Sequence, residues 1–373
     1  MRYAKYQRSI SMEIQVNAAT SQYAVIIGAN NLGTSVETYK TLFEKADKIV
    51  LLTDEHVWRI HEQYVRTNIP YEFEVFVMPG GEACKTFEVF GEAHSFMLTQ
   101  QCTRKSLVLA LGGGAVGDLA GFVAATYMRG VPFIQIPTTI LAHDSAVGGK
   151  TAINHPNGKN MVGAFYQPAA VLYDTTFLKT LPKKEVRSGM TEVIKHAMLS
   201  DANWLEEMVK LDITAIEETL LTTYLAKGVQ VKATIVEQDE TEQSVRKFLN
   251  LGHTYGHALE AAAGYGKLTH GESVMIGLLY MLLLSEKYGE ISRDDTMRFA
   301  RFTKENGYPL DAIYSYSFDT LKSYLMKDKK ADYGELHFVL LRNIAQPFMQ
   351  IVDLQTCEET DQQLRMLIEE VLA

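Results

Sequence analysis

The segment from Arg246 to Glu260 carries the side chains with the clearest chemical potential in this sequence. His253 and His257 are four residues apart, so they lie on one face if the segment is helical. Arg246 and Asn250 precede His253 by seven and three residues and are predicted to share that face. Glycines flank the histidines, which indicates close approach of another backbone. The spacing therefore predicts a site where an arginine, an amide and two imidazoles converge.

A third histidine and an acid lie outside this segment, at His270 and Glu192. One carboxylate with two imidazoles is a ligand set that leaves an open position on a catalytic divalent metal ion, usually zinc. An HxxxH pair by itself is more often structural, but the flanking glycines favour a metal site here. Helical spacing alone would pair His253 with His257 as the two imidazole ligands.

A second motif follows the apolar run at residues 107–111. The run is short enough for a buried strand, and it ends in the sequence GGGAVGD at residues 112–118 before a helical pattern begins. This is the context of a dinucleotide-binding turn, in which backbone amides and a helix N-terminus hold the pyrophosphate. The sequence therefore predicts a nucleotide site at this turn.

The usual partner of the adenosine ribose is missing from this motif. It is an acid about 20 residues after the turn, but no Asp or Glu occurs between residues 119 and 143. Asp54, at the end of another apolar run, and Glu82, in a Pro-Gly-Gly-Glu segment, are the available alternatives. The choice between them stays open at this point.

These motifs need a scaffold, and the first half of the chain supplies one. Short β-rich runs alternate there with helical patterns, at residues 23–27, 48–53, 73–78, 107–111, 133–136 and 171–173. Such alternation predicts parallel strands joined by helical crossovers. We therefore expect an N-terminal Rossmann-like α/β domain with a mostly parallel sheet, a dinucleotide-binding domain at residues 1–182.

The pattern changes after Pro182. Apolar residues then recur with the helical period in residues 205–225, 274–288 and 364–372. Two late β-like runs, at 337–341 and 348–352, predict a small hairpin. We expect a mainly α-helical metal- and substrate-binding domain at residues 183–373, with the active site in the interdomain cleft.

Composition excludes several classes of protein. The net charge of −9 argues against a nucleic-acid partner. No apolar run reaches the roughly 18 residues that a bilayer span requires, and no apolar segment of a signal peptide follows the basic N-terminus. The 3 cysteines are too few and too scattered for a disulfide framework, so a reducing, cytoplasmic location is expected.

Cations recur beside the glycine-rich segments of this acidic chain, for example Lys150 and Lys159. Most lysines lie on solvated faces, but this setting favours a role in holding phosphate and carboxylate oxygens. A small anionic substrate is the expected partner.

Together, these motifs resemble those of the 3-dehydroquinate synthase family. The resemblance covers nearly the whole chain and rests on residues 79–86, 112–118, 137–139, 144–150, 154–160, 189–195, 249–257 and 270–272. It implies a lyase of the shikimate pathway that uses NAD and one divalent metal ion, Zn or Co, and that forms a homodimer. Its reaction converts 3-deoxy-arabino-heptulosonate 7-phosphate to 3-dehydroquinate and phosphate. The implied route is transient oxidation by NAD, β-elimination of phosphate, re-reduction, ring opening and intramolecular aldol closure.

The resemblance also implies roles for individual residues. It makes Glu192, His253 and His270 the metal ligands and His257 a substrate-facing acid/base group, which corrects the pairing that helical spacing alone gives. The implied substrate contacts are Asp144, Lys150, Asn160, Lys195, Lys232, Arg246 and Asn250. Arg129 matches a phosphate contact contributed across the dimer, and either Lys329 or Lys330 matches another. The implied NAD contacts are Asp54, Glu82, Lys85, Gly114, Ala115, Val116, Gly117, Asp118, Thr138, Thr139, Lys150, Lys159, Phe177, Leu178, Lys179 and Thr180.

Three alternatives remain open from the sequence. Another sugar phosphate cyclase would share the fold, NAD and the metal, although Arg246, Asn250 and His257 together favour a substrate with a carboxylate. A metal- and NAD-dependent polyol dehydrogenase of the same superfamily would release NADH steadily, whereas the synthase reaction has no net redox change. An NAD-binding regulatory module would keep the glycine turn and lack the set of one acid and two histidines.

Overall fold

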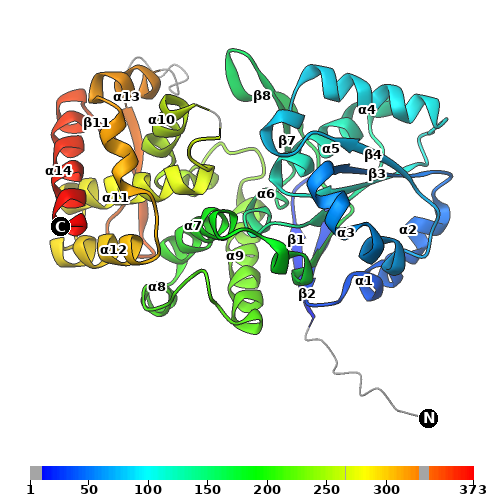
Figure 1. Cartoon of the computed structure of the whole chain (residues 1–373), viewed down its shortest axis with the longest axis horizontal. Helices are drawn as coiled ribbons and strands as arrows, with labels where there is room; N and C mark the ends of the chain where they lie inside the picture. Colours follow the sequence, from blue (N-terminus) through cyan, green and yellow to red (C-terminus); the bar gives the residue numbers. More distant parts are fainter. Residues whose placement is uncertain (1–10, 265, 327–335) are drawn as a thin grey trace, which may run out of the picture. The chain divides into compact units, whose positions relative to one another are not determined.

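The computed structural model describes residues 11–264, 266–326 and 336–373, which fold into two compact units (Figure 1). Unit 1 contains the chain up to residue 181 together with residues 218–241. Unit 2 contains residues 182–217 and 242–373. The sequence analysis assigned residues 218–241 to the second domain, and this assignment differs from the structure. The apolar pattern at 205–225 spans two helices that belong to different units.

Unit 1 is an α/β unit built on a seven-stranded sheet. The strands of the large sheet are β1 (Met12–Asn17), β2 (Gln22–Gly28), β3 (Ile49–Asp54), β4 (Glu74–Met78), β5 (Leu107–Gly112), β6 (Phe133–Pro137) and β9 (Ala170–Asp174). Two further strands of the unit, β7 (Lys150–His155) and β8 (Gly158–Phe165), lie outside this sheet. Its α-helices are α1 (Leu32–Thr38), α2 (Lys40–Lys45), α3 (Glu55–Asn68), α4 (Phe87–Thr99), α5 (Gly114–Thr126), α6 (Ala142–Ser145) and α9 (Glu218–Gln238). Short 3-10 helices are η1 (Gly81–Cys84), η2 (Tyr127–Arg129) and η3 (Thr175–Thr180).

The strand order in the large sheet is β1-β2-β9-β6-β5-β3-β4. Every neighbouring pair is parallel except β1 with β2, so the predicted Rossmann-like parallel sheet is confirmed. The sequence analysis did not predict the antiparallel hairpin of β7 and β8, which forms a separate two-stranded sheet. That hairpin carries Lys150 at the start of β7 and Asn160 within β8.

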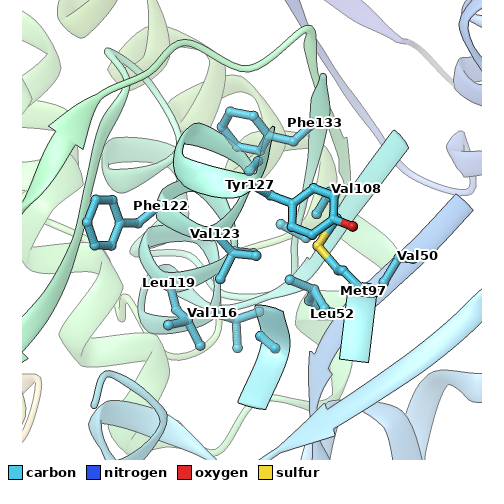
Figure 2. Close-up of a cluster of buried hydrophobic side chains, with 14 of the residues drawn as sticks. Val50, Leu52, Met97, Val108, Val116, Leu119, Phe122, Val123, Tyr127 and Phe133 are labelled. Carbon is cyan, nitrogen blue, oxygen red and sulfur yellow. The ribbon is translucent and has the colours of Figure 1, made fainter. Parts of the chain in front are cut away.

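Helix α5 is held against this sheet by an apolar core (Figure 2). The sheet contributes residues such as Val50, Leu52 and Val108, all with no exposed surface. Val116 and Val123 of α5 pack into the same cluster and are at most 1% exposed. Because α5 begins directly after the glycine turn, this packing fixes where its N-terminus points.

Unit 2 is mainly helical, as predicted. Its elements are α7 (Lys183–Ser200), α8 (Ala202–Met208), η4 (Val245–Asn250), α10 (His253–Ala263), α11 (His270–Tyr288), α12 (Arg293–Glu305), η5 (Leu310–Ser315), α13 (Phe318–Leu325), β10 (Leu336–Leu341), β11 (Pro347–Val352) and α14 (Leu354–Leu372). The predicted late hairpin is present as the antiparallel pair β10 and β11. Among the helices of the described residues, none has both the length and the apolar character needed to cross a membrane.

Candidate active site

Three helices of unit 2 bring the predicted metal ligands together. Glu192 lies in the middle of α7, and His253 and His270 are the first residues of α10 and α11. Glycine permits the close packing of these helices. A Cβ atom at Gly271 would lie 1.9 Å from the carbonyl oxygen of Ser188 on α7, and one at Gly256 would lie 2.9 Å from Cα of Val274 on α11. The close backbone approach predicted from the flanking glycines is therefore present at both positions.

The resulting cluster contains one carboxylate and three imidazoles. Oε1 of Glu192 lies 3.6 Å from Nε2 of His253 and 3.3 Å from Nε2 of His270. His253, His257 and His270 each offer a ring nitrogen within 4.8 Å of the others. The other carboxylate oxygen of Glu192 pairs with Nζ of Lys195, three residues further along α7. Both side chains of that pair are only 1% exposed, so a charge at this site is poorly screened by water.

The two imidazoles nearest Glu192 differ in their proton affinity. Burial, followed by the positive charge of Lys195, holds the pKa of His253 well below its usual value. Burial acts in the same direction on His270, but hydrogen bonds to Glu192 and Glu260 outweigh it and raise the pKa of His270 to about 10. His253 is therefore neutral and ready to coordinate a metal, whereas His270 must lose a proton to do so.

The second nitrogen of each ring has its own partner. Nδ1 of His253 lies 3.0 Å from the carbonyl oxygen of Leu251, and Nδ1 of His270 lies 3.2 Å from Oε2 of Glu260. In both rings the Nε2 atom is thus the one that approaches Glu192. A buried carboxylate with two such nitrogens is the donor set of a catalytic divalent metal site, so these residues fit such an ion.

The single helix predicted for residues 246–260 is not present. Arg246 and Asn250 lie on the 3-10 helix η4, and Gly252, with φ of +77°, separates it from α10. Helical spacing therefore does not relate these two residues to the histidines. Arg246 is fully buried, and Nδ2 of Asn250 donates to Oε1 of Glu242 at 2.8 Å. The sequence analysis did not single out Glu242, which has no helical or glycine signal and is identified only by this contact.

The glycine turn of unit 1 lies at the edge of the sheet where the parallel strands end. Strands β3, β5 and β6 end at Asp54, Gly112 and Pro137, and helix α5 begins at Gly114. No side chain caps α5, and its first turn has no acidic residue. Its leading amides therefore point at the position where a phosphate would bind.

Two further features of this edge fit a nucleotide. Among the described residues, the hydroxyls of Thr138 and Thr139 are buried and have no hydrogen-bond partner. A Cβ atom at Gly114 would lie 2.9 Å from Oγ of Ser145, so a side chain there would fill the space beside the turn. Orphaned hydroxyls beside uncapped amides are the donors and acceptors that a dinucleotide requires.

The two candidates for the ribose contact have other partners in the structure. Oδ1 of Asp54 accepts hydrogen bonds from the backbone amides of His56 and Val57 and so caps helix α3. Oε2 of Glu82 accepts Nδ2 of Asn154 at 2.7 Å. Each carboxylate has a second oxygen that could accept a ribose hydroxyl.

Lys85 links two other predicted site residues within unit 1. Its Nζ is 2.7 Å from Oδ2 of Asp118 and also bonds Oδ1 of Asn160. Burial lowers the pKa of Lys85, but the charges of Asp118 and Glu82 outweigh it and raise the pKa. Lys85 is therefore a buried cation that joins the start of α5 to the β7–β8 hairpin.

A second cation of unit 1 pairs with a predicted substrate contact. Nζ of Lys232 on α9 lies 3.1 Å from Oδ1 of Asp144 on α6, and it also bonds the Asp144 carbonyl oxygen. This contact is one of several that join α9 to unit 1, because α9 also packs against β1 and β2, although it follows the first helices of unit 2 in the sequence.

The remaining predicted residues are more dispersed. Arg129 is exposed in η2, with a φ of +69°. Lys150 is exposed and Lys159 half-buried on the β7–β8 hairpin. Phe177 and Leu178 are buried, whereas Lys179 pairs with Glu218 at 3.0 Å and Thr180 bonds His61 at 3.1 Å. The alternatives Lys329 and Lys330 lie outside the described residues.

Comparison with known proteins assigns the chain to a family. Residues 75–188 match the family model described as 3-dehydroquinate synthase N-terminal, and residues 189–331 match 3-dehydroquinate synthase C-terminal. The 3-dehydroquinate synthase of Lysinibacillus sphaericus (strain C3-41) is 60% identical over 362 residues, covering 97% of this chain and 100% of the relative. That of Geobacillus thermodenitrificans (strain NG80-2) is 45% identical and covers 92% of this chain and 95% of the relative.

The fold has solved counterparts. A crystal structure of 2-deoxy-scyllo-inosose synthase, complexed with carbaglucose-6-phosphate, NAD+ and Co2+, superposes with a TM-score of 0.85 at 25% sequence identity. The match covers 94% of this chain and 99% of that protein. The sequence identity over nearly the full length, both family models and this shared fold agree. The chain belongs to the 3-dehydroquinate synthase family.

Proposed function

We propose that the chain converts 3-deoxy-arabino-heptulosonate 7-phosphate to 3-dehydroquinate and phosphate, with NAD and one divalent metal ion as cofactors. The observation that carries this proposal is the convergence of Glu192, His253 and His270 in a chain 60% identical to a curated 3-dehydroquinate synthase. The 25% identity to 2-deoxy-scyllo-inosose synthase makes a different cyclase the weaker alternative.

Glu192, His253 and His270 are the proposed metal ligands. Both Nε2 atoms approach the same carboxylate oxygen, and both Nδ1 atoms are occupied by other acceptors, which supports this choice over one that includes His257. A metal ion held by these residues would supply Lewis-acid polarisation of a substrate hydroxyl, and NAD would supply reversible hydride transfer. His257 is left to face the substrate as an acid or base.

The nucleotide is proposed to bind unit 1. The uncapped N-terminus of α5, at Gly114 to Asp118, would hold its pyrophosphate, and Thr138 and Thr139 would supply hydroxyls. Asp54 or Glu82 would bind its ribose. The further contacts proposed are Lys85, Lys150, Lys159 and residues 177–180, of which Lys85 already holds Asp118 in place.

The anionic substrate is proposed to bind a set of cationic and polar side chains. These residues are Arg129, Asp144, Lys150, Asn160, Lys195, Lys232, Arg246 and Asn250. Buried cations favour this role, because Lys195, Lys232 and Arg246 are at most 6% exposed in an otherwise acidic chain. Their charges would hold the substrate carboxylate and phosphate and stabilise phosphate as it leaves.

A homodimer and a cytoplasmic location complete the proposal. Arg129 would reach the partner's substrate in such a dimer, and its exposure in η2 is compatible with that. Sedimentation of the purified protein tests the dimer.

One assay tests the reaction. The purified protein is incubated with the heptulosonate phosphate and catalytic NAD, and phosphate release is followed with and without a chelator. Phosphate should be released without accumulation of NADH, should stop on chelation, and should resume when zinc or cobalt is added. Stoichiometric NADH would instead indicate a polyol dehydrogenase, and full activity of a protein shown to be metal-free would refute the metal site.

A further inference from the structure

Glu260 is a half-buried carboxylate on α10 to which neither the comparisons nor the proposed reaction assigns a role. Its Oε2 lies 3.2 Å from Nδ1 of His270, and its side chain is 15% exposed. The other nitrogen of the same ring, Nε2, lies 3.3 Å from Oε1 of Glu192. The His270 imidazole is thus held between two carboxylates, one at each ring nitrogen.

The two nitrogens of an imidazole cannot both be donors and still bind a metal. When Nδ1 of His270 carries the proton and donates a hydrogen bond to Glu260, Nε2 keeps its lone pair. That lone pair is directed to the side where Glu192 lies. A hydrogen bond to a carboxylate also transfers electron density to the ring and makes Nε2 a stronger donor.

The partner of His253 differs in charge. Nδ1 of His253 lies 3.0 Å from the neutral carbonyl oxygen of Leu251. This contact fixes the orientation of the ring without adding a negative charge. The cluster therefore contains two imidazoles in similar positions, one with a carbonyl oxygen at Nδ1 and the other, His270, with a carboxylate there.

We propose that Glu260 is a positioning residue of the metal site, which fixes the Nδ1–H form of His270 and strengthens Nε2 as a metal donor. This inference rests on the proposed ligand set Glu192, His253 and His270. Helix α10 then has two functions, because it supplies one ligand from its first turn and supports another ligand two turns later. His253 and Glu260 are seven residues apart and so lie on one face of the helix.

Two substitutions separate the charge of Glu260 from its position. E260A removes both the acceptor and the charge, whereas E260Q keeps an oxygen that can accept the Nδ1–H and removes only the charge. E286Q is the matched control, because it removes one negative charge from α11 at a point about 24 Å along the helix from His270.

The primary measurement is the affinity of the full-length, metal-free protein for Co2+, followed by the visible absorption of the bound ion. E260A should weaken binding by about 10–100-fold, the usual cost of losing such a partner, and should alter the absorption spectrum. E260Q should lose less, and E286Q should match the unsubstituted protein. Equal affinities and spectra for all four proteins would overturn the inference.

A second measurement uses the unsubstituted protein and does not depend on how the variants fold. In the zinc-loaded, 15N-histidine-labelled protein, His270 should show an Nδ1–H proton that exchanges slowly with solvent. An Nε2–H form of His270 would overturn the inference. Failure of the unsubstituted protein to bind Co2+ at all would refute the metal site of the proposed function as well, so the two failures are distinguishable.

Discussion

The glycine turn of unit 1 and the histidine cluster of unit 2 are built on opposite principles. The turn is a continuous segment, residues 112–118, and it presents backbone amides at the end of a strand. The cluster takes its side chains from three helices and from residues as far apart as Glu192 and His270. A site made of consecutive backbone groups is visible in the sequence, whereas a site made of distant side chains depends on how the helices pack.

The two regions also differ in electrostatics. Helix α5 has no acidic residue in its first turn and no basic residue in its last, so its N-terminus offers only a partial positive charge. The cluster places a buried carboxylate and a buried lysine at close range to three imidazoles. We therefore expect changes in the cluster to have large effects on activity and changes in the turn to have moderate effects on affinity.

The largest effect is expected from His253, which forms a matched pair with His257 on α10. His253→Ala should remove a ligand and lose both the metal and detectable turnover. His257→Ala should keep the metal and NAD but slow phosphate release by about 10²–10⁴-fold, as for a lost general acid or base. Metal content and rate are measured on each purified variant. A metal-free His257→Ala beside a metal-containing His253→Ala would reverse the ligand assignment.

Gly114→Val is expected to have a smaller effect, confined to unit 1. Its Cβ would lie 2.9 Å from Oγ of Ser145 and would crowd the space beside the turn. The side chain would occupy space that the pyrophosphate needs beside the turn, so the dissociation constant for NAD should rise by roughly 10–100-fold, which is about 1.4–2.7 kcal/mol of binding free energy. Calorimetric titration with NAD gives this constant, and the metal content of the variant serves as the control. Unchanged NAD binding would mean that the nucleotide does not approach the backbone at this glycine.

The pH dependence of metal binding should show the smallest effect. Burial opposes protonation of His270, but its bonds to Glu192 and Glu260 raise the pKa to about 10 in the metal-free protein. Below that pH the metal ion must displace a proton from His270. Its association constant should therefore fall about tenfold for each unit by which the pH is lowered. Co2+ titrations at pH 7 and pH 8 measure this slope. A constant affinity across that range would show that His270 is not protonated before the metal binds.

Much of the fold was predictable because it follows from local patterns. Each short apolar run of the first half became a strand of the parallel sheet, since period and length decide between strand and helix there. The late hairpin at β10 and β11 was visible for the same reason. The sequence analysis grouped helix α9 with the second domain, because its apolar pattern does not record that the helix packs against β1 and β2 of unit 1.

The sequence by itself determined the glycine turn, the residue types of the proposed metal ligands and the family, because these depend on residue types in a fixed order. The prediction of one continuous helix from residue 246 to residue 260 was wrong, because Gly252 separates η4 from α10. The spacing of an ideal helix therefore could not relate Arg246 or Asn250 to the histidines. Only the tertiary structure decided that Nε2 of His253 and of His270 both approach Glu192, and that Glu260 lies behind His270. These contacts depend on the close packing of α7, α10 and α11 at Gly271 and Gly256, where a single added carbon would separate the helices.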